Sequence, residues 1–210
     1  MIDGILHLTH LGVSFQGTGH LIGERQYFVR FAGCSIKRCP IRDDCDEFTS
    51  FGRHNGFNAS VEDVIDRALD AVGPGGWLHV TGGEPTEQPE NLAKLVQLAH
   101  RKRLRVQIQT AGLTVLNSPL DWITVSPKVP ARKLQQRSGQ ELVLVYDGQT
   151  VEEMREYQEG TSFRHYYLQP KWIDAPRGEA MNNEETVRAA HSLGGEWKLT
   201  LQAHKYLGIY

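Results

Sequence analysis

Three cysteines gathered in one short segment are the residues of this chain best suited to chemistry. The segment reads FVRFAGCSIKRCPIRDDCDEF, and Cys34, Cys39 and Cys45 within it are the only cysteines among the 210 residues. Their odd number argues against a framework of disulfide bonds. Three thiolates can hold a [4Fe–4S] cluster through three of its irons, whereas a cluster that only transfers electrons usually has ligands on all four. The segment therefore predicts a cluster with one open iron.

An open iron can bind a substrate or a cofactor. In radical S-adenosylmethionine (SAM) enzymes it binds the amino and carboxylate groups of SAM, and an electron from the cluster then cleaves the carbon–sulfur bond. A structural zinc site with His20 or His54 is a second interpretation, although zinc ligands usually come as short paired knuckles and the spacing here is Cys-x4-Cys-x5-Cys. Ordinary buried cysteines are a third, which fits poorly with the charged residues nearby. These are Lys37, Arg38, Arg42, Asp43 and Asp44.

A second segment, HVTGGEPTEQPE at 79–90, favours the SAM interpretation. A strand runs into Gly82 and Gly83, which have no Cβ and so let a ligand approach the backbone closely. Glu84 could then accept a hydrogen bond from a cationic amine. Gly-Gly-Glu-Pro on its own could be a simple turn. One β/α unit after the cysteine segment, however, it resembles the radical SAM motif that holds the methionine amino group of the cofactor.

Apolar periodicity predicts strands that alternate with helices. The clearest helix is 60–73, where Ser60 and Asp63 have the form of a capping box and Gly73 can end the helix. The other expected helices are 89–102, 150–158 and 183–193. The expected strands are 5–9, 26–31, 77–81, 105–110, 122–126, 141–146, 164–169 and 196–202. Alternation of this kind indicates an α/β fold with a parallel sheet covered by helices.

The segments without such periodicity are expected to lie outside the sheet. Residues 130–140 read as a polar surface loop, and 40–59 as a long irregular segment around the cysteines. Polar residues follow strand after strand, and in parallel α/β folds the ligand site lies at the carboxyl ends of the strands. Polar loops after strands are also common without any function. The residues concerned are Arg30, Gly82–Glu84, Gln109–Thr110, Ser126–Lys128, Asp147, Gln169 and Gln202–His204.

Composition limits the possible partners and location. A net charge of −2 gives no bulk electrostatic case for nucleic acid binding. No apolar run reaches the ~18 residues that a helix needs to cross a bilayer. The first residues lack the basic start and long apolar core of a secretion signal, so we expect a cytoplasmic protein without a membrane partner. We expect one domain over residues 1–210, with a cluster-binding loop at about 32–59.

These motifs occur in an order that resembles a known family, 7-carboxy-7-deazaguanine synthase, a radical SAM family of the queuosine pathway. The matching segments are SFQGTGHLIGERQYFVRFAGC, TGGEP, QTAG, VSPK, YLQP and, most specifically, WKLTLQAHKYLGIY at the end. The resemblance implies a modified, incomplete (β/α) TIM-type barrel, usually dimeric. It implies conversion of 6-carboxy-5,6,7,8-tetrahydropterin by ring contraction and loss of ammonia, with Mg²⁺ and regenerated SAM. An electron donor such as a flavodoxin or ferredoxin would supply the electron.

The resemblance also implies roles for individual residues. Cys34, Cys39 and Cys45 would bind the cluster. The residues implied at SAM are Gly82, Gly83, Glu84, Asp46, Ser126, Pro127, Lys128 and Gln169. Those implied around the pterin are Phe15, Gln16, Gly17, Arg30, Thr81, His204 and Tyr210, among which Arg30, Gln16 and His204 are implied in catalysis. The planar guanidinium of Arg30 suits the substrate carboxylate.

The sequence differs from the usual family pattern at three places. These differences bear on the identity of the substrate more than on the radical SAM chemistry. The cysteine spacing is longer than the usual Cys-x3-Cys-x2-Cys. The usual Gln-Gly-Glu-Gly reads Gln16-Gly17-Thr18-Gly19, which removes a carboxylate. The usual Cys-Asp-Thr ends in Glu47, so Glu47 or the nearby Thr49 is the expected Mg²⁺ ligand. A radical SAM enzyme for a different pterin or purine therefore remains an alternative, and a non-catalytic zinc-binding module is a third.

The end of the sequence carries one further expectation. The strand 196–202 continues into AHKYLGIY without a polar spacer, and Leu207 and Ile209 are apolar. We expect this tail to dock in the site, with the carboxylate of Tyr210 accepting hydrogen bonds from the amine edge of a pterin. Packing of the tail elsewhere on the barrel or on a dimer partner is the alternative.

Overall fold

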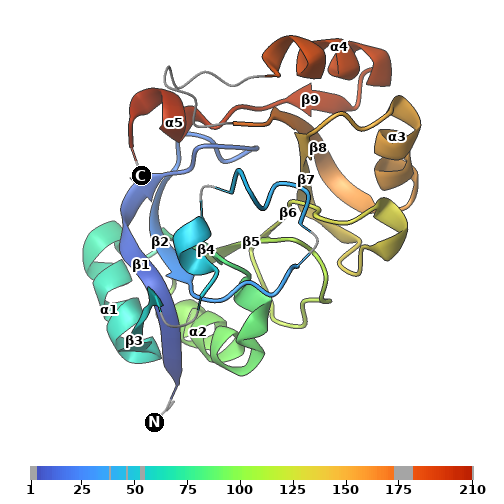
Figure 1. Ribbon diagram of the computed structural model, residues 1–210. Helices are drawn as coiled ribbons and strands as arrows, with labels where there is room; N and C mark the ends of the chain where they lie inside the picture. The colour runs from blue at the N-terminus through green and yellow to red at the C-terminus, as the bar shows by residue number, and fades with distance from the viewer. Residues whose placement is uncertain (1–3, 38, 46, 53–54, 173–181, 210) are drawn as a thin grey trace.

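The computed structural model is dominated by one curved sheet of nine strands. It describes residues 4–37, 39–45, 47–52, 55–172 and 182–209. The strand order is β3-β1-β2-β4-β5-β6-β7-β8-β9. Neighbouring strands from β2 to β9 pair in parallel, whereas β1 pairs antiparallel with both β2 and β3. Since β3 and β9 lie at the two edges, the sheet curves without closing (Figure 1).

The strands are short, as is usual for an α/β sheet. Their bounds are β1 Ile5–Phe15, β2 Arg25–Phe31, β3 Phe57–Ser60, β4 Trp77–Gly82, β5 Arg105–Thr110, β6 Trp122–Val125, β7 Ser138–Tyr146, β8 Ser162–Pro170 and β9 Trp197–Leu199. Side chains alternate between the two faces of a strand. In β4, Leu78 and Val80 belong to the core beneath the helices, and His79 and Thr81 face the other way, toward the concave interior. The expected parallel sheet is confirmed from β2 through β4 to β9, whereas β1 and β3 add antiparallel strands at one edge.

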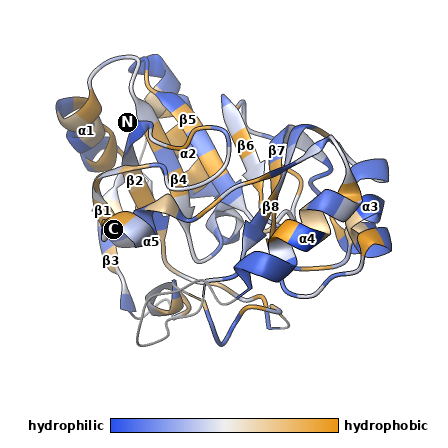
Figure 2. Cartoon of the chain, turned by 90° about the horizontal axis from the view of Figure 1, so that it is seen from above, coloured by the Kyte–Doolittle hydropathy of each residue, from blue (hydrophilic) through white to orange (hydrophobic). Residues whose placement is uncertain are grey.

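Four of the five helices in the described residues cover the convex face of the sheet, and the last lies against the loop that follows the first strand (Figure 1). Their bounds are α1 Val61–Val72, α2 Pro89–Arg101, α3 Val151–Glu159, α4 Asn183–Leu193 and α5 Ala203–Leu207, with short 3-10 turns η1 Phe48–Ser50, η3 Pro85–Glu87 and η4 Ala131–Lys133. The predicted ends of α1 are confirmed: the Ser60 hydroxyl accepts from the Asp63 N–H at 3.1 Å, and Gly73 ends the helix with φ +70°. Figure 2 shows polar and apolar residues on the same helices, as expected of helices with one buried face.

Two apolar cores hold the helices to the sheet. The first lies between α1, α2 and the strands β1, β2, β4 and β5, and includes Ile65, Leu95 and Ile108. The second lies between α3, α4 and the strands β6 to β8, and includes Leu144 and Met154. The helices therefore cover one face of each strand. The other face and the carboxyl ends of the strands are available for a ligand site. In the part of the chain that the structure describes, no helix is long and apolar enough to cross a membrane.

Three expectations about the elements need correction. Residues 57–59 of the expected irregular segment belong to β3, because β3 pairs with Ile5 to Leu8 of β1. Residues 130–140 are not simply a surface loop: Leu134 is fully buried in the second core, and β7 already begins at Ser138. The strand expected at 196–202 is confined to Trp197–Leu199, and α5 follows it.

Candidate active site

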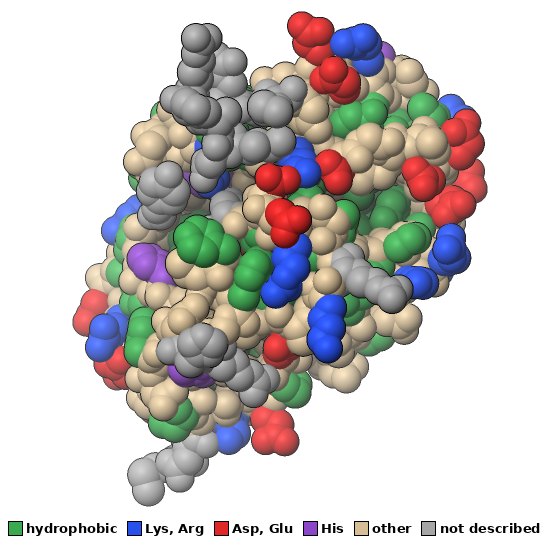
Figure 3. Space-filling model, viewed as in Figure 1, with side chains coloured by type: hydrophobic (Ala, Val, Ile, Leu, Met, Phe, Trp, Pro, Cys, Tyr) green, Lys and Arg blue, Asp and Glu red, His purple; other side chains and the backbone are tan. Residues whose placement is uncertain are grey.

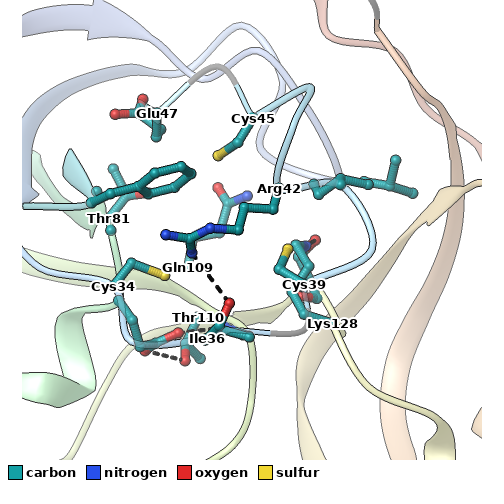
Figure 4. Close-up of a pocket in the computed structure, with 18 of the residues that line it drawn as sticks. Cys34, Ile36, Cys39, Arg42, Cys45, Glu47, Thr81, Gln109, Thr110 and Lys128 are labelled. Carbon is teal, nitrogen blue, oxygen red and sulfur yellow. Dashed lines mark hydrogen bonds between the residues drawn. The ribbon is translucent and has the colours of Figure 1, made fainter. Parts of the chain in front are cut away.

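The three cysteines lie on one wall of a cleft at the carboxyl ends of the strands. All three are partly buried, and in Figure 4 their sulfurs surround a common space. The Arg42 guanidinium extends into this space and lies 4.3 Å from the centre of the Phe51 ring. Burial raises the pKa of the Cys34 thiol. Three thiols facing one space fit a cluster in which each thiolate binds a different iron.

The described residues offer no preformed site for a single metal ion. Among them, no group of three or more His, Cys, Asp or Glu side chains converges as a metal-binding group. His20, one of the two histidines considered for a zinc site, instead stacks on His165 with 4.4 Å between ring centres. The other, His54, lies outside the described residues.

The wall opposite the cysteines is built from the ends of five parallel strands. The cleft is open to solvent, and its empty volume, with the open solvent included, is about 870 Å³. Its lining residues, besides the cysteines, are Ile36, Ile41, Arg42, Glu47, Phe51, Thr81, Gly82, Gly83, Glu84, Gln109, Thr110, Ala111, Ser126, Lys128, Val145, Gln169 and Gln202. The structure thus brings most of the residues expected at SAM to one cleft with the cysteines. Pro127 is buried but does not line it, and Asp46 lies outside the described residues.

The double glycine lets two backbones come together beside the cleft. Gly82 has φ +113°, and a Cβ there would overlap the backbone of Phe31. A Cβ on Gly83 would overlap the carbonyl of Gly33. Hydrogen bonds from the Gly83 N–H to the Phe31 carbonyl (2.9 Å) and from the Glu84 N–H to the Gly33 carbonyl (2.8 Å) complete the contact. The glycines therefore attach the start of the cysteine segment to the end of β4.

Glu84 ties that junction to the next strand. Its side chain is buried, and its Oε1 accepts from the Thr110 hydroxyl at 2.7 Å and from the Thr86 hydroxyl at 2.8 Å. Oε2 accepts from the Ala111 N–H at 2.8 Å. With these bonds Glu84 holds the loop after β4 against the loop after β5. The sequence suggested an amine acceptor, and the structure adds this bracing role.

A second pocket adjoins the cleft and holds the residues expected around the pterin. Its lining residues are Ser14, Phe15, Gln16, Gly17, Thr18, Phe28, Arg30, Glu47, His79, Thr81, Gln109, Gln169, Gln202 and His204. Its empty volume is about 640 Å³. Glu47, Thr81, Gln109, Gln169 and Gln202 line both spaces, so the two form adjoining parts of one site. The expected pterin residue Tyr210 lies outside the described residues.

Within the second pocket the Arg30 guanidinium forms an ion pair with the Glu47 carboxylate. The other oxygen of Glu47 accepts from the Ser50 hydroxyl at 3.3 Å. Thr49, the other residue expected to ligate Mg²⁺, is exposed on η1 and lines neither space. Of the two candidates, the structure therefore brings only Glu47 to the site.

Gln16 and His204 approach the pocket from the loop after β1 and from α5. The Gln16 Oε1 accepts from the N–H groups of Gly17 (2.8 Å) and Thr18 (3.3 Å), so this oxygen is already used. A Cβ on Gly17 would overlap the His204 ring, and the Ala203 N–H donates to the Gly17 carbonyl at 2.8 Å. The tail is thus docked beside the pocket through α5, as far as the described residues extend.

Sequence reasoning missed several residues of this site. His79 lines the second pocket, and burial, with a smaller effect from the charge of Arg30, lowers its pKa to about 3. The period-two pattern of β4 could have identified it, because His79 shares a face with Thr81. The Glu47–Arg30 pair had no signal in the sequence, since it joins a strand to an irregular segment.

Comparisons with known proteins show the family of this chain. The chain is 32% identical to a 7-carboxy-7-deazaguanine synthase of Caulobacter vibrioides, over 94% of this chain and 95% of the relative. It is 33% identical to one of Nitratidesulfovibrio vulgaris, over 93% and 95%. The chain belongs to the 7-carboxy-7-deazaguanine synthase family.

A solved structure extends the family likeness to the fold. The crystal structure of QueE from Escherichia coli matches with a TM-score of 0.66 over 95% of each chain, at 20% identity. Together with the open sheet, this match confirms the predicted incomplete (β/α) barrel. No family model matches the chain.

Proposed function

We propose that this chain is a radical SAM carbon–nitrogen lyase that converts 6-carboxy-5,6,7,8-tetrahydropterin to 7-carboxy-7-deazaguanine, with ring contraction and loss of ammonia. The observation that carries the proposal is the pair of adjoining spaces at the strand ends. One is lined by three cysteines and the Gly-Gly-Glu junction, and the other by Arg30 and Gln16. Membership of the 7-carboxy-7-deazaguanine synthase family supports this substrate and product.

The first space is where the cluster and SAM are proposed to bind. Cys34, Cys39 and Cys45 would hold three irons. When bound, the reduced cluster and SAM supply a radical that abstracts a hydrogen atom from the substrate. Glu84 fixes the loops that face the SAM methionine, and the Lys128 ammonium, which donates to the carbonyl (2.9 Å) and hydroxyl (2.7 Å) of Ser126, fixes the loop after β6. The remaining residues proposed at SAM are Gly82, Gly83, Asp46, Pro127 and Gln169.

The second space is proposed for the pterin. Arg30 offers the charged donor for the 6-carboxylate. Gln16 has its oxygen held by the backbone, and its amide nitrogen lies 3.0 Å from the His79 Nδ1 at the pocket. Phe15 and Thr81 line the same space. His204, which lies against Gly17, is the side chain of α5 that lines the pocket, and an imidazole there can exchange a proton with the ligand. Neutral His79 lies deeper in the pocket.

Magnesium is proposed to bind at Glu47. A carboxylate oxygen is a hard ligand of the kind Mg²⁺ prefers, and Mg²⁺ usually completes its shell with water and substrate oxygens. Mg²⁺ held by Glu47 would take this carboxylate from Arg30 and leave the Arg30 guanidinium able to bind the substrate carboxylate. The proposed partners are a small electron-transfer protein, such as a flavodoxin or ferredoxin, and a second copy of the chain. Figure 3 shows acidic and basic side chains intermingled on this face, without a large patch of either sign.

A different pterin or purine substrate is the second candidate, and Thr18 favours it. The Thr18 hydroxyl is buried and donates to the Gln169 Oε1 at 2.6 Å, so this position offers the ligand no carboxylate. The basic amine edge of a pterin would then meet a less acidic pocket than in relatives with Glu at this position.

The deciding experiment is a product assay with anaerobically reconstituted protein, SAM, Mg²⁺ and a chemical reductant. We expect 6-carboxytetrahydropterin to give 7-carboxy-7-deazaguanine, identified by mass spectrometry, and tetrahydropterin without the carboxylate to give none. SAM cleavage that occurs without this product would favour the second candidate.

A further inference from the structure

The concave interior of the sheet contains a row of buried polar side chains beneath the site. Five neighbouring strands each contribute one residue, and none is more than 1% exposed. These are Gln26, His79, Gln107, Thr124 and Glu141. The interior of a parallel barrel is more often filled by branched apolar side chains. Buried polar groups are costly unless they are hydrogen-bonded, so the bonds that this row makes indicate what it does.

The five side chains form one continuous chain of hydrogen bonds across the sheet. The Thr124 hydroxyl donates to the Glu141 Oε1 at 2.7 Å, and the Gln107 amide donates to the Thr124 hydroxyl at 3.2 Å. The Gln26 amide donates to the Gln107 Oε1 at 2.8 Å, and the His79 Nδ1 lies 2.7 Å from the Gln26 Oε1. With the proton on Nδ1, every donor in the row points toward Glu141. Burial raises the pKa of the Glu141 carboxyl, and the hydrogen bonds from His20 and Thr124 act in the opposite direction. When the carboxyl is ionised, it polarises each bond of the row in the same sense.

Both ends of this row contact the same short segment of the second pocket, residues 16–20. The Glu141 Oε2 accepts from the His20 N–H at 2.7 Å. Gly19, with φ +72°, passes so close to this carboxylate that a Cβ would overlap it. At the other end, the Gln16 Nε2 lies 3.0 Å from the His79 Nδ1. The row therefore bridges beneath the segment from its first residue to its last.

The segment is held separately at its middle. Thr18 donates to Gln169, and the Gly19 N–H donates to the Thr200 hydroxyl at 2.8 Å. The row of polar residues adds a contact at each end: Glu141 accepts from His20, and His79 lies within hydrogen-bond distance of Gln16, which lines the pocket. These contacts come in addition to the backbone bonds of Gln16 with Glu24 and Gly23 and the stacking of His20 on His165.

The state of the His79 ring decides which groups Gln16 can offer a ligand. The His79 Nδ1 carries either a proton or a lone pair. Gln26 and Gln16 compete for this one nitrogen, because Gln26 can only accept there and Gln16 can only donate. With the proton present, the ring donates to Gln26; without it, the ring accepts from Gln16. With the proton on Nδ1 the row is polarised toward Glu141 and Gln16 is not bonded to His79, so both N–H groups of the Gln16 amide remain for the pocket. With Nδ1 unprotonated, Gln16 donates one of them to the row.

We propose that Glu141 and Thr124 are positioning residues for the ligand of the second pocket, which they do not touch, because they support residues 16–20 through this row. This inference rests on the proposed function for the identity of the ligand. Neither residue lines the cleft or the second pocket. A row that serves only the stability of the sheet is the competing explanation, and it predicts no selective effect on ligand binding.

The test is the substitution Thr124→Val, which keeps the shape and removes the hydroxyl between Gln107 and Glu141. Thr124→Ser restores the hydroxyl. Thr186→Val is the matched control, because Thr186 is also fully buried and its hydroxyl donates to the Asn182 carbonyl of α4, away from the row. Two quantities are measured on the holoenzyme with SAM: the Kd of 6-carboxytetrahydropterin, and hydrogen exchange of the backbone amides of residues 16–20.

We expect Thr124→Val to weaken the ligand about tenfold or more and to speed amide exchange of residues 16–20 by a similar factor, since a lost buried hydrogen bond has effects of this size. SAM affinity should not change, and Thr124→Ser should return both quantities toward the wild type. Thr186→Val should lower the melting temperature without affecting either. Unchanged exchange and affinity in Thr124→Val would overturn the inference. If the wild type itself does not bind this pterin, the proposed substrate is wrong, and the exchange measurement alone still decides whether the row positions the segment.

Discussion

Arg30 and Glu47 pair with each other inside the pocket proposed for the substrate, so the chain places a carboxylate of its own on the residue expected to bind the substrate carboxylate. Arg30 lies in β2 and Glu47 in the segment after Cys45. The Glu47 carboxylate and the substrate carboxylate compete for the Arg30 guanidinium. The affinity for the ligand therefore depends on whether another group binds Glu47 in place of Arg30. Mg²⁺ is the group best suited to do so.

Glu47→Gln should therefore tighten binding of 6-carboxytetrahydropterin when Mg²⁺ is absent. Removal of the competing charge should lower the Kd by about tenfold, because a close charged pair of this kind is worth more than ~1.4 kcal/mol. The wild type should gain affinity when Mg²⁺ is added, and the variant should lose this response. Titration calorimetry of the holoenzyme with and without Mg²⁺ measures both. Asp43→Asn, an exposed carboxylate in the same segment, is the control for net charge, and an equal gain in that variant would show that the effect is not local.

Arg30→Ala should weaken the same ligand by about 30-fold or more, because loss of one partner of a buried charged pair costs ~2–5 kcal/mol. SAM affinity should stay nearly unchanged. Arg30→Lys keeps the charge without the planar fork, so we expect it to recover only part of the affinity. Separate Kd values for SAM and for the pterin provide the test. An equal loss of both affinities would mean that Arg30 supports the whole site and does not contact the pterin specifically.

The sequence alone was sufficient for elements that carry their own local signals. The apolar period of α1, its Ser60 cap and Gly73 fixed that helix before any tertiary contact was considered. It was not sufficient where a distant partner decides the structure. Residues 57–60 become β3 only because β1 lies beside them, and Leu134 is buried only because the second core covers it.

The residues of the site likewise fall into those with a local sequence signal and those whose contacts depend on distant partners. Gly82, Gly83 and Glu84 were identified because a strand, two glycines and an acid form a local motif. The partners of Glu84 and Glu47 depend on how the loops after different strands meet, which no spacing in the sequence encodes. Glu141 has no motif around it, and its role emerges only from the bonds that cross the sheet.

Glu84→Gln should lower SAM affinity by about tenfold and reduce stability by ~1–3 kcal/mol. An amide has only one acceptor oxygen, so its NH₂ group would face either the Ala111 N–H or the hydroxyls of Thr110 and Thr86. Equilibrium dialysis with SAM and a thermal melt measure the two effects. Glu90→Gln, an exposed residue in the first turn of α2, serves as the control. If the stability falls and SAM binding does not, Glu84 braces the loops without shaping the SAM site.

Lys171→Met should shorten the lifetime of the bound cluster. The Lys171 ammonium pairs with Asp44 of the cysteine segment at 2.7 Å and with Asp147 after β7 at 3.0 Å, so it joins that segment to the far side of the cleft. The Asp44 bond is the main cause of the raised Lys171 pKa. Each partly exposed pair contributes up to ~1 kcal/mol, so we expect iron loss to a chelator to accelerate by up to about fivefold per pair. Arg188→Met removes an exposed pair on α4 and should leave the rate unchanged.

The most direct test of the central claim is the metal content of the anaerobically reconstituted protein, measured together with SAM cleavage. The account predicts about four irons and four sulfides per chain, an absorbance band near ~400 nm, and reductive cleavage of SAM. In Cys34→Ala, Cys39→Ala and Cys45→Ala, cleavage should be abolished while circular dichroism shows a folded protein, because the cysteines lie outside both apolar cores. One zinc ion per chain and no iron after reconstitution would contradict the account.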